Sequence, residues 1–460
     1  MNARKYKLNI ILVCVATGVL LFGGRFVGRV SAVAKETYDN IEVFTNALAL
    51  VQKNYVDPVT TKQLIDGAIT GMLSALDPHS SYLPPDLFKE LQVDTRGSFG
   101  GLGIEITTHN NVLTVVSPIE DTPAYRAGVK PGDQIIKIQD EFTKDMPLVE
   151  AVKRMRGAPG TKIHLSLRRE GLPRLLEMTL TREVIRIQSV KYRMLEKGYG
   201  YLRITQFQER TDDDLQHALT SLEKDSGGAL SGLVLDLRNN PGGLLTQAVK
   251  VSNEFVDSGL VVYTDGRLES QKQKYFAHKG GSHTEFPMIV LVNAGSASAS
   301  EIVAGCLQDH KRALVLGTQT FGKGSVQTIL PLDETSAIRL TTARYYTPNG
   351  RSIQATGITP DVVVENVIAQ AKAGGGAVPS FPTIREQNLP RHFGNKKNGG
   401  SESIEPKLEG EQPEPETEPA DTDVPLTREG ELGKDPQLDR ALELLKSWNV
   451  FKTVVAQNAS

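Results

Sequence analysis

Cysteine, tryptophan and histidine are scarce in this chain of 460 residues, which has 2, 1 and 8 of them respectively. Cys14 lies in an apolar N-terminal run and Cys306 in a stretch with helical periodicity, so we expect no disulfide. On an apolar helix face Cys306 would act as a small hydrophobe rather than as a nucleophile. No residue pattern has metal-ligand spacing, and Asp236 fits a structural role better than a metal-binding one. We therefore expect no metal and no cofactor.

An excess of one charge is also lacking, because 52 Lys and Arg nearly balance 54 Asp and Glu. A net charge of −2 gives no general attraction to nucleic acid, so we expect no such partner. Acidic residues nevertheless concentrate in residues 401–435, which hold 12 acidic and 3 basic side chains. Hydrophobic residues make up 39% of the chain, enough for folded cores, and its length predicts two or more domains.

Only one long uncharged apolar run occurs, at residues 8–24, and basic residues precede it. This pattern is typical of an export signal, although the run is at the short limit for a membrane span. Residues 30–32 resemble a cleavage site, so a cleaved signal and a retained anchor both stay open. Arg25 and Arg29 separate the run from that site, which favours the anchor. Segment 1–36 thus predicts an extracytoplasmic, periplasmic protein, anchored to the inner membrane if the segment is retained.

The chain is organised around residues 293–327. The apolar run Met288–Val292 just before them predicts a buried strand, and small residues and then helical spacing follow it. Ser298 falls at the start of the predicted helix, where unpaired N–H groups and the helix dipole favour negative charge. A serine there could attack a carbonyl while nearby N–H groups hold the oxyanion. Ser298 and Glu301 also fit a capping box, in which the serine would only cap the helix. From these residues alone both interpretations stay open.

A serine nucleophile needs a base, and no histidine is obviously placed to serve Ser298, whereas a buried lysine with a lowered pKa could do so. Lys323 lies between two glycines, and Gln327 follows four residues later. On an extended strand this spacing puts both side chains on one face, so Gln327 could orient the lysine amine. A solvated turn lysine is the alternative. Residues 317–323 match part of a phosphate-binding loop, but Gly324 stands where Ser or Thr would hold magnesium, which argues against a nucleotide site.

The run Gly-Ser-Ala-Ser-Ala-Ser-Glu around Ser298 and the run Phe-Gly-Lys-Gly-Ser-Val-Gln around Lys323 resemble the signature of C-terminal processing proteases. These enzymes, also called tail-specific proteases, form peptidase family S41, and the resemblance covers residues 38–364. It implies a Ser298 nucleophile, a Lys323 general base and a Gln327 that orients the lysine. It also implies an α/β core of the ClpP/crotonase-like fold and no cofactor. The implied oxyanion hole is built from backbone N–H groups, those of Ala299 and of Gly242 or Gly243.

Residues 96–182 combine short strand patterns with two helices and resemble a PDZ domain. Glycines in its opening loop would let successive N–H groups converge on a terminal carboxylate while the peptide adds as a strand. A plain glycine-rich hairpin is the alternative, and Ile106 replaces the third glycine of a dinucleotide loop. The residues that match the carboxylate-binding loop are Gly101, Leu102, Gly103 and Ile104. Before this domain, residues 37–95 have helical spacing. The family resemblance implies that such a helical segment can mediate dimers, and a simple packing role is the alternative.

Residues 183–365 are predicted to be the catalytic core, because strand and helix patterns alternate and favour a parallel sheet. Catalytic groups are expected at the carboxyl ends of such strands, where the Asn-Pro-Gly-Gly turn 240–243 and Ser298 both fall. Residues 366–434, rich in Gly, Pro and Glu, are predicted to be a disordered acidic linker. Residues 435–460 predict a helix that docks on the core or on a partner. The expected fold class is a multidomain α/β protein.

These features together predict an exported serine endopeptidase that cleaves proteins near their C-terminal tails, with the tail recognised by the PDZ domain. The expected partners are protein substrates with free tails, an adaptor such as a lipoprotein, and further copies of the chain in a homodimer or higher oligomer. Two rivals remain, a catalytically silent PDZ scaffold on the same core and a ligand-binding protein of this fold. The intact Ser298, Lys323 and Gln327 favour the enzyme.

Overall fold

The computed structural model describes residues 38–109, 112–279, 283–365, 384–392, 394 and 430–458, with side chains as far as residue 448. The chain divides into two compact units, Met1–Ala75 and Leu76–Ser460. The predicted leader, residues 1–36, lies outside the described residues. Among the helices that are described, none combines the length and the apolar character needed to span a bilayer.

The described part of the first unit is helical, as predicted for this region. Residues 38–54 form one helix and α2 (Thr61–Ser74) forms the next. Thr60 and Gln63 close a reciprocal capping box at the start of α2, with hydrogen bonds of 3.2 and 2.9 Å. Gln52 Nε2 donates to Thr61 Oγ1 at 2.8 Å and so connects the two helices.

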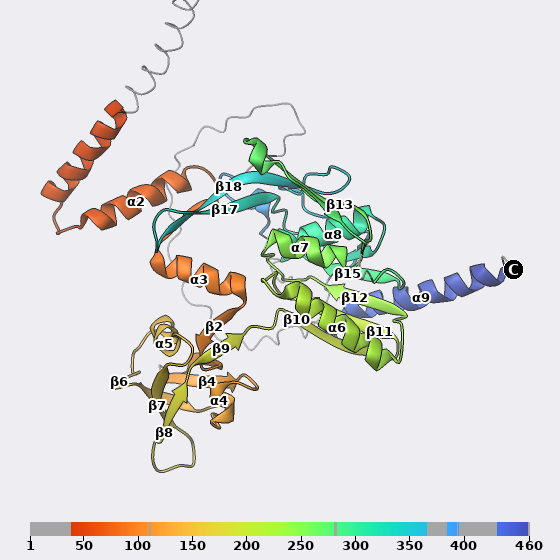
Figure 1. Ribbon diagram of the computed structural model, residues 1–460, viewed down its shortest axis with the longest axis horizontal. Coiled ribbons are helices and arrows are strands. Elements are labelled where there is room, and N and C mark those ends of the chain that lie inside the picture. The colour runs from red at the N-terminus through yellow and green to blue at the C-terminus, as the bar shows by residue number, and fades with distance from the viewer. Residues whose placement is uncertain are drawn as a thin grey trace, which may run out of the picture. The chain divides into compact units, whose positions relative to one another are not determined.

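A small β-rich body follows (Figure 1), and it occupies the region predicted to be a PDZ domain. Its main sheet has the strand order β3-β4-β5-β7-β8, with β6 beside β5. Because β3 pairs only with β4 among the described strands, one edge of β3 is open. A separate antiparallel pair, β2 and β9, lies where the chain enters and leaves the body. Its elements are β2 (Ser98–Gly101), β3 (Ile104–His109), β4 (Val112–Pro118), α4 (Pro123–Arg126), β5 (Gln134–Ile138), β6 (Glu141–Phe142), α5 (Leu148–Met155), β7 (Lys162–Arg168), β8 (Leu176–Thr181) and β9 (Glu183–Arg186).

The core contains a sheet of six strands in the order β10-β11-β12-β15-β16-β19. All neighbouring strands pair parallel except β10 and β11, which form an antiparallel hairpin. The predicted, largely parallel sheet is therefore confirmed. Its strands are β10 (Val190–Glu196), β11 (Tyr199–Ile204), β12 (Gly232–Asp236), β15 (Met288–Val292), β16 (Leu314–Gly317) and β19 (Val362–Val363). The helices that follow these strands in the chain are α6 (Thr211–Ser226), α7 (Leu245–Asn253) and α8 (Ala299–Asp309).

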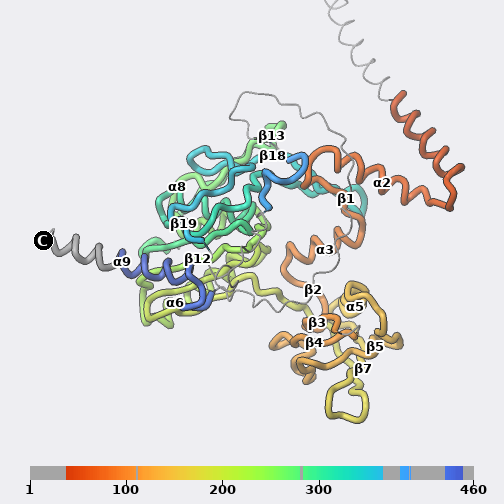
Figure 2. Tube along the Cα trace, turned by 180° about the vertical axis from the view of Figure 1, so that it is seen from behind, coloured from red at the N-terminus to blue at the C-terminus, as the bar shows by residue number. Residues whose placement is uncertain are grey.

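Both faces of this sheet are covered, and the alternation along β12 shows it. Leu233 and Leu235 join an apolar cluster that includes residues of α6, α7 and α8. Val234 lies between them in sequence and joins a second cluster with Leu438 and Leu445 of α9 (Pro436–Asn458). Successive strand residues point to opposite faces, so α9 packs on the face away from the other helices. Figure 2 shows α9 running alongside β12.

A second, antiparallel sheet carries the loop that contains Lys323. Its strands follow the order β1-β18-β13-β14, and β17 also pairs with β18. The pairing of β17 with β18 shifts register between Val326 and Gln327, which marks a β-bulge. The elements of this part are β1 (Ser81–Leu83), α3 (Pro85–Arg96), β13 (Gly259–Gly266), the 3₁₀ turn η1 (Glu269–Gln271), β14 (Lys274–Ala277), β17 (Ser325–Pro331) and β18 (Ala337–Tyr346).

Two pieces of the chain after the core pack against it. Residues 384–392 include the 3₁₀ turn η3 (Glu386–Asn388), and the Glu386 side chain is fully buried. This differs from the prediction of a disordered linker over residues 366–434, because buried polar contacts hold this short piece in place. The other described residues of that span are Gly394 and 430–434, and the remainder lies outside the described residues. The predicted C-terminal helix is confirmed as α9, and it docks on the core of its own chain.

Candidate active site

Ser298 directly precedes α8, after the turn that leaves the carboxyl end of β15. Its side chain is buried, and its backbone has φ +56° and ψ −114°. Residues other than glycine rarely adopt positive φ, and such strain, about 1–3 kcal/mol, persists only where the surroundings impose it, often at functional sites. The N–H of Ala299, the first of the helix, donates no hydrogen bond to any described residue. Ser298 therefore sits in a strained turn beside an open donor.

The Ser298 hydroxyl is not used to cap the helix. Its side chain makes no capping hydrogen bond, and its hydroxyl is hydrogen-bonded with that of Tyr345 instead. Burial raises the pKa of Tyr345 to about 12, although the bond with Ser298 opposes this shift. Tyr345 thus keeps its proton at neutral pH. The serine half of the predicted capping box is therefore not formed, whereas the glutamate half is, through the bond from the Ser298 N–H to Glu301.

The Glu301 carboxylate connects the Ser298 turn to the Lys323 loop. Oε2 accepts the backbone N–H of Ser298 at 2.8 Å and that of Lys323 at 2.9 Å. Oε1 accepts the N–H of Gly322 at 2.7 Å and the hydroxyl of Thr320 at 2.5 Å. Burial raises the pKa of Glu301 to about 7, although these hydrogen bonds act in the opposite direction. One buried carboxyl group therefore fixes both segments relative to each other.

Lys323 lies in the loop between β16 and β17. Burial lowers its pKa from the usual lysine value, and the positive charge of Arg339 lowers it further. Negative charges on Glu386, Glu301 and Asp77 act in the opposite direction without reversing the shift. A lysine with a lowered pKa is more often neutral and can accept a proton. No hydrogen bond joins Lys323 Nζ to the Ser298 hydroxyl within the part of the chain that the structure describes.

Gln327 lies in β17, but the argument that placed it on the same strand face as Lys323 is wrong. Lys323 precedes the strand, and the bulge at Gln327 interrupts the regular pairing. The Gln327 amide nitrogen donates to Ser325 Oγ at 3.0 Å and to Thr341 Oγ1 at 3.4 Å. Its Oε1 is therefore the atom available to accept a bond from the lysine amine. No such bond occurs among the described residues.

The predicted oxyanion residues gather around Ser298. A Cβ atom on Gly242, where φ is +102°, would lie 2.8 Å from Ser298 Cβ and 2.9 Å from Ala299 N. Only glycine permits so close an approach at this φ. The Gly242 N–H already donates to Asn240 Oδ1 at 2.9 Å. The Gly243 N–H, by contrast, donates no hydrogen bond within the described residues. Among these glycines, Gly243 thus has the open donor.

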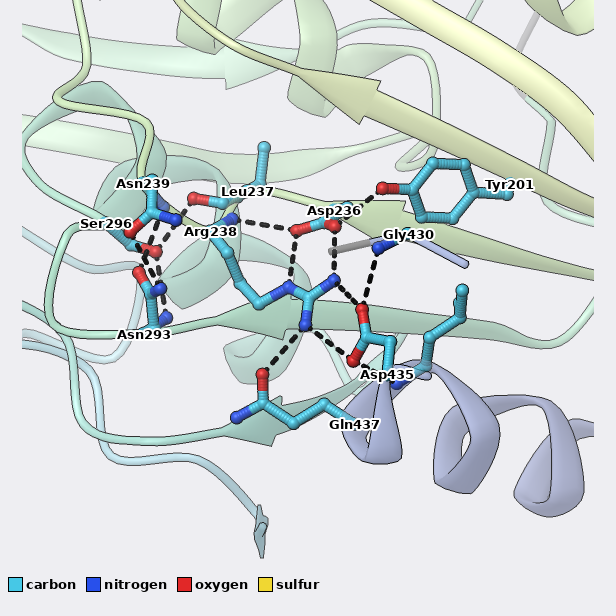
Figure 3. Close-up of polar contacts among 11 residues, drawn as sticks. Tyr201, Asp236, Leu237, Arg238, Asn239, Asn293, Ser296, Gly430, Asp435 and Gln437 are labelled. Atoms are coloured by element: carbon cyan, nitrogen blue, oxygen red, sulfur yellow. Dashed lines mark hydrogen bonds and ion pairs between the residues drawn. The ribbon is translucent and has the colours of Figure 1, made fainter. Parts of the chain in front are cut away.

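A buried ion cluster holds the chain just before this glycine turn (Figure 3). Arg238 is fully buried and forms a bidentate pair with Asp435, with distances of 3.0 and 2.7 Å. It also donates to Asp236 at 3.0 and 2.7 Å and to Gln437 Oε1 at 2.9 Å. The Tyr201 hydroxyl donates to Asp236 Oδ2 at 2.7 Å. Asp236 is therefore part of a structural network, as the sequence predicts.

The same network reaches the Ser298 turn through the residues beside Arg238. Asn239 has φ +54°, and its N–H donates to Asn293 Oδ1 at 2.9 Å. The Ser296 hydroxyl donates to the carbonyl of Leu237 at 2.8 Å. Figure 3 shows these contacts next to the ion cluster. The C-terminal segment, the glycine turn and the Ser298 turn are thus joined by one set of polar contacts.

Known proteins resemble this chain over most of its length. The profile of peptidase family S41 matches residues 198–364, and a PDZ domain profile matches residues 100–180. A third profile, the N-terminal domain of the activating protease CtpB, matches residues 27–86. A carboxy-terminal-processing protease of Bartonella bacilliformis is 47% identical over 378 residues, 81% of this chain and 86% of the relative. The chain belongs to the carboxy-terminal processing proteases of peptidase family S41.

Further relatives of this serine protease family are more distant. The carboxy-terminal processing protease CtpA of Bacillus subtilis is 36% identical over 370 residues, 79% of this chain and 77% of the relative. A solved photosystem II D1 C-terminal processing protease is 33% identical, with 70% of this chain and 92% of that chain covered and a TM-score of 0.41. The helical N-terminal region, the PDZ domain and the α/β protease core predicted from the sequence are confirmed.

The predicted tail-binding loop of this S41 chain lies between β2 and β3. Leu102 is buried in the apolar core of the PDZ domain, and Ile104 packs against that core. The N–H groups of Leu102 and Gly103 make no hydrogen bonds to the described residues, whereas their carbonyls are paired with Ala124 and Ile119 at 3.0 and 2.8 Å. The loop therefore presents free donors next to the open edge of β3, the arrangement that strand addition requires.

Several residues at the centre of this protease were not predicted as site residues. Glu301 was visible only as half of a capping box, and Tyr345 lies in a strand that carries no simple pattern. Glu386 lies in a span that composition marks as a linker, so no local signal points to it. Within the described residues no group of three His, Cys, Asp or Glu side chains could hold a metal ion. Cys306 is fully buried, and burial raises its pKa to about 12, which suits its predicted apolar role.

Proposed function

We propose that this chain is an active serine endopeptidase that uses Ser298 as nucleophile and Lys323 as general base. The observation that carries the proposal is the Glu301 carboxylate, which holds the backbones of both residues on one oxygen atom. The strained, buried turn at Ser298 and the lowered pKa of Lys323 support the same roles. A nucleophile and a base held by one rigid group are typical of preorganised catalysis.

The proposed reaction is acyl transfer through a covalent intermediate. Neutral Lys323 takes the proton of Ser298 as the serine oxygen attacks the substrate carbonyl. The N–H groups of Gly243 and Ala299 stabilise the oxyanion, because both are open in the absence of substrate. Lys323 then gives the proton to the leaving amine, and water hydrolyses the acyl-enzyme by the same route. For this step the Ser298 hydroxyl must turn from Tyr345 to Lys323. Catalytic hydrogen bonds often become short and well aligned only when substrate is bound.

Gln327 is proposed to orient the base. Its amide nitrogen donates to Ser325 and Thr341, so its Oε1 is left to accept a hydrogen bond from Lys323 Nζ. An acceptor at Lys323 Nζ would hold the amine with its lone pair toward Ser298. Gly242 is proposed to act by its size alone, because its N–H is taken by Asn240 and any side chain would collide with Ser298.

Tail recognition is proposed for the loop of Gly101, Leu102, Gly103 and Ile104. Substrates would be proteins whose free C-terminal residue is apolar, with the carboxylate on the N–H groups of the loop and the peptide paired with β3. Export, anchoring in the inner membrane, an adaptor partner and homo-oligomers are proposed on the sequence features alone. Cell fractionation with and without residues 1–36 tests export and anchoring.

The rival function is a catalytically silent PDZ scaffold, and one experiment separates the two. The full chain is incubated with a loosely folded protein that ends in an apolar residue, either with a free carboxyl terminus or with an amidated one. The proposal predicts cleavage of the free form, a raised KM for the amidated form, and no cleavage by Ser298→Ala. Equal cleavage of both forms would refute recognition of the C-terminal carboxylate by the loop. Binding without any cleavage by the wild-type chain would support the scaffold.

A further inference from the structure

The loop that carries Lys323 is held from two sides. On one side Glu301 binds the N–H groups of Gly322 and Lys323. On the other side lies a segment that the chain reaches only after the core, residues 384–389. Because that segment is far from the loop in sequence, its contacts are a product of the tertiary fold and not of a local turn.

Arg385 clamps the start of the loop. Its guanidinium donates to the carbonyl of Thr320 at 3.3 and 3.0 Å and to Gln319 Oε1 at 3.0 Å. It also donates to the carbonyl of Thr356 at 3.3 Å. The next backbone N–H, that of Glu386, donates to the carbonyl of Phe321 at 3.1 Å. Two consecutive residues thus fix successive carbonyls ahead of Lys323.

The Glu386 side chain reaches the far end of the same loop through one intermediate. It is fully buried, and its Oε1 accepts from Gln354 Nε2 at 2.8 Å. Gln354 Oε1 in turn accepts the N–H of Gly324 at 3.0 Å. His79 Nε2 contacts both carboxylate oxygens of Glu386, at 3.0 and 2.9 Å. The carboxylate is therefore held by His79 and Gln354, and Gln354 connects it to Gly324, the residue after Lys323.

We propose that Arg385 and Glu386 are positioning residues for Lys323, which hold the loop that carries it from both ends. The proposal rests on the assignment of Lys323 as general base. Burial of a carboxylate is costly unless it is paired, and the partners of Glu386 are His79 and Gln354, the second of which holds the residue after Lys323.

The charges that act on Lys323 come from four elements. Arg339 of β18 disfavours the protonated amine, whereas Glu386 of η3, Glu301 of α8 and Asp77 ahead of β1 favour it. Removal of the Glu386 charge should therefore make Lys323 lose its proton more easily. The His79 ring lies on the Glu386 carboxylate and is retained in the variants below.

The test measures the protonation of Lys323 directly in the full chain. Acetylation by a water-soluble acylating reagent is followed against pH, and the Lys323 peptide is quantified by mass spectrometry. Glu386→Gln keeps the size and one acceptor oxygen of the side chain. We expect the midpoint of Lys323 labelling to move to lower pH, and the rising limb of kcat/KM to move with it. Glu254→Gln is the matched control, because Glu254 is also buried and accepts from Gln216 at 2.8 Å. Its midpoint should stay at the wild-type value.

Arg385→Gln tests the clamp with a side chain that is partly exposed, so folding is less at risk. Loss of the guanidinium should speed amide exchange at Gly322 and Lys323 and should also lower the labelling midpoint, as Glu386 moves away. Arg440→Gln is the control, since Arg440 pairs with Glu443 on the surface of α9. Circular dichroism shows whether each variant is folded. If Glu386→Gln does not fold, the result for Arg385→Gln tests the proposal by itself.

An unchanged midpoint in folded Glu386→Gln would overturn the proposal, and so would a loss of activity at all pH values with no movement of the midpoint. Unchanged exchange in Arg385→Gln would overturn the clamp. The labelling needs no proteolysis, so its result stands apart from the proposed function. That function fails separately if Ser298 forms no acyl adduct.

Discussion

Ser298 and Lys323 donate their backbone N–H groups to the same atom, Oε2 of Glu301, at 2.8 and 2.9 Å. The two residues are brought together by their main chains, while their side chains are not hydrogen-bonded to each other within the described residues. Any change at Glu301 should thus act on both at once, because the carboxylate is the only group described that accepts from the two N–H donors. This relationship gives the first prediction.

Glu301→Gln should lower kcat strongly and destabilise the fold. The amide offers one acceptor oxygen in place of two and turns an NH₂ group toward N–H donors. A backbone N–H that faces the NH₂ group is left without an acceptor, which costs about 1–3 kcal/mol, so a loss of that size in unfolding free energy is expected. Urea denaturation and cleavage kinetics measure both effects. Glu254→Gln, another buried carboxyl, should leave kcat unchanged, and wild-type kcat in Glu301→Gln would contradict this role.

The pH dependence of Glu301 follows from its raised pKa of about 7. As pH falls through that value the folded protein takes up a proton, and the protonated oxygen no longer accepts the N–H donors equally, so activity should fall. The folded state binds this proton more tightly than the unfolded state. The stabilisation from this group is therefore complete below the ordinary glutamate pKa and is lost as pH rises through about 7. Urea titrations at several pH values should show this loss in the wild-type chain and not in Glu301→Gln.

Lys323→Arg should be inactive at every pH, because arginine does not release its proton in the accessible range. In the wild-type chain the rate should rise with pH until Lys323 is neutral, at a pH below the usual lysine value. A pH profile of kcat/KM measures this limb. Lys311→Arg, an exposed lysine at the end of α8, serves as the control and should keep the wild-type profile. An active Lys323→Arg enzyme would exclude this lysine as the base.

Much of the fold follows from apolar runs in the sequence, whereas the amphipathic strands do not. The strand Met288–Val292 was predicted with the bounds that the structure gives. The strand Ala337–Tyr346 was missed, since most of its residues are only half-buried and Arg339 and Arg344 interrupt the apolar pattern. Strand periodicity is a weak signal where both faces are partly covered.

The candidate site was also predictable from the sequence only in part. The turn at Ser298 and the glycines beside it could be predicted, because special backbone geometry requires small residues there. The geometry around Gln327 could not, because the bulge depends on the partner strand. The contacts of Glu386 with His79 and of Asp435 with Arg238 span 307 and 197 residues. No local pattern encodes pairs so far apart in sequence.

Asp435→Asn should destabilise the core, although α9 lies outside the matched protease region. Burial alone would raise the pKa of Asp435, but Arg238 outweighs it and the pKa is lowered. Removing one partner of a buried ion pair costs about 3–5 kcal/mol, which we expect in the unfolding free energy. The glycine turn next to Arg238 should loosen, so kcat should also fall. Glu443→Gln, on the exposed side of α9, should change the unfolding free energy by less than about 0.5 kcal/mol. Equal stability of both variants in urea would contradict the role of the cluster.

Gly103→Ala should weaken tail binding without changing the chemistry. Gly103 has φ +74°, and a Cβ there would lie 2.3 Å from Thr122 Cβ, so the loop must shift. We expect a raised KM with a smaller change in kcat, as when uniform binding is lost. Binding of a labelled C-terminal peptide to the Ser298→Ala chain measures the loop directly. Gly160→Ala is the control, because Gly160 has a similar φ of +87° but no atom close to a Cβ placed there. It therefore separates the effect of backbone strain from that of the clash with Thr122. Identical peptide affinity in the two glycine variants would refute the proposal that this loop binds the C-terminal tail.

The assignment of Ser298 as nucleophile is the central claim, and covalent labelling tests it most directly. The full chain is treated with an activated acylating probe for serine hydrolases, and the adduct is located by peptide mass spectrometry. Ser296→Ala and Ser300→Ala are the controls, because both hydroxyls are buried and bonded to backbone carbonyls, at 2.8 and 2.9 Å. We predict one adduct per chain on Ser298, retained in both controls and absent in Ser298→Ala. An adduct that persists in Ser298→Ala, together with retained cleavage, would contradict the account.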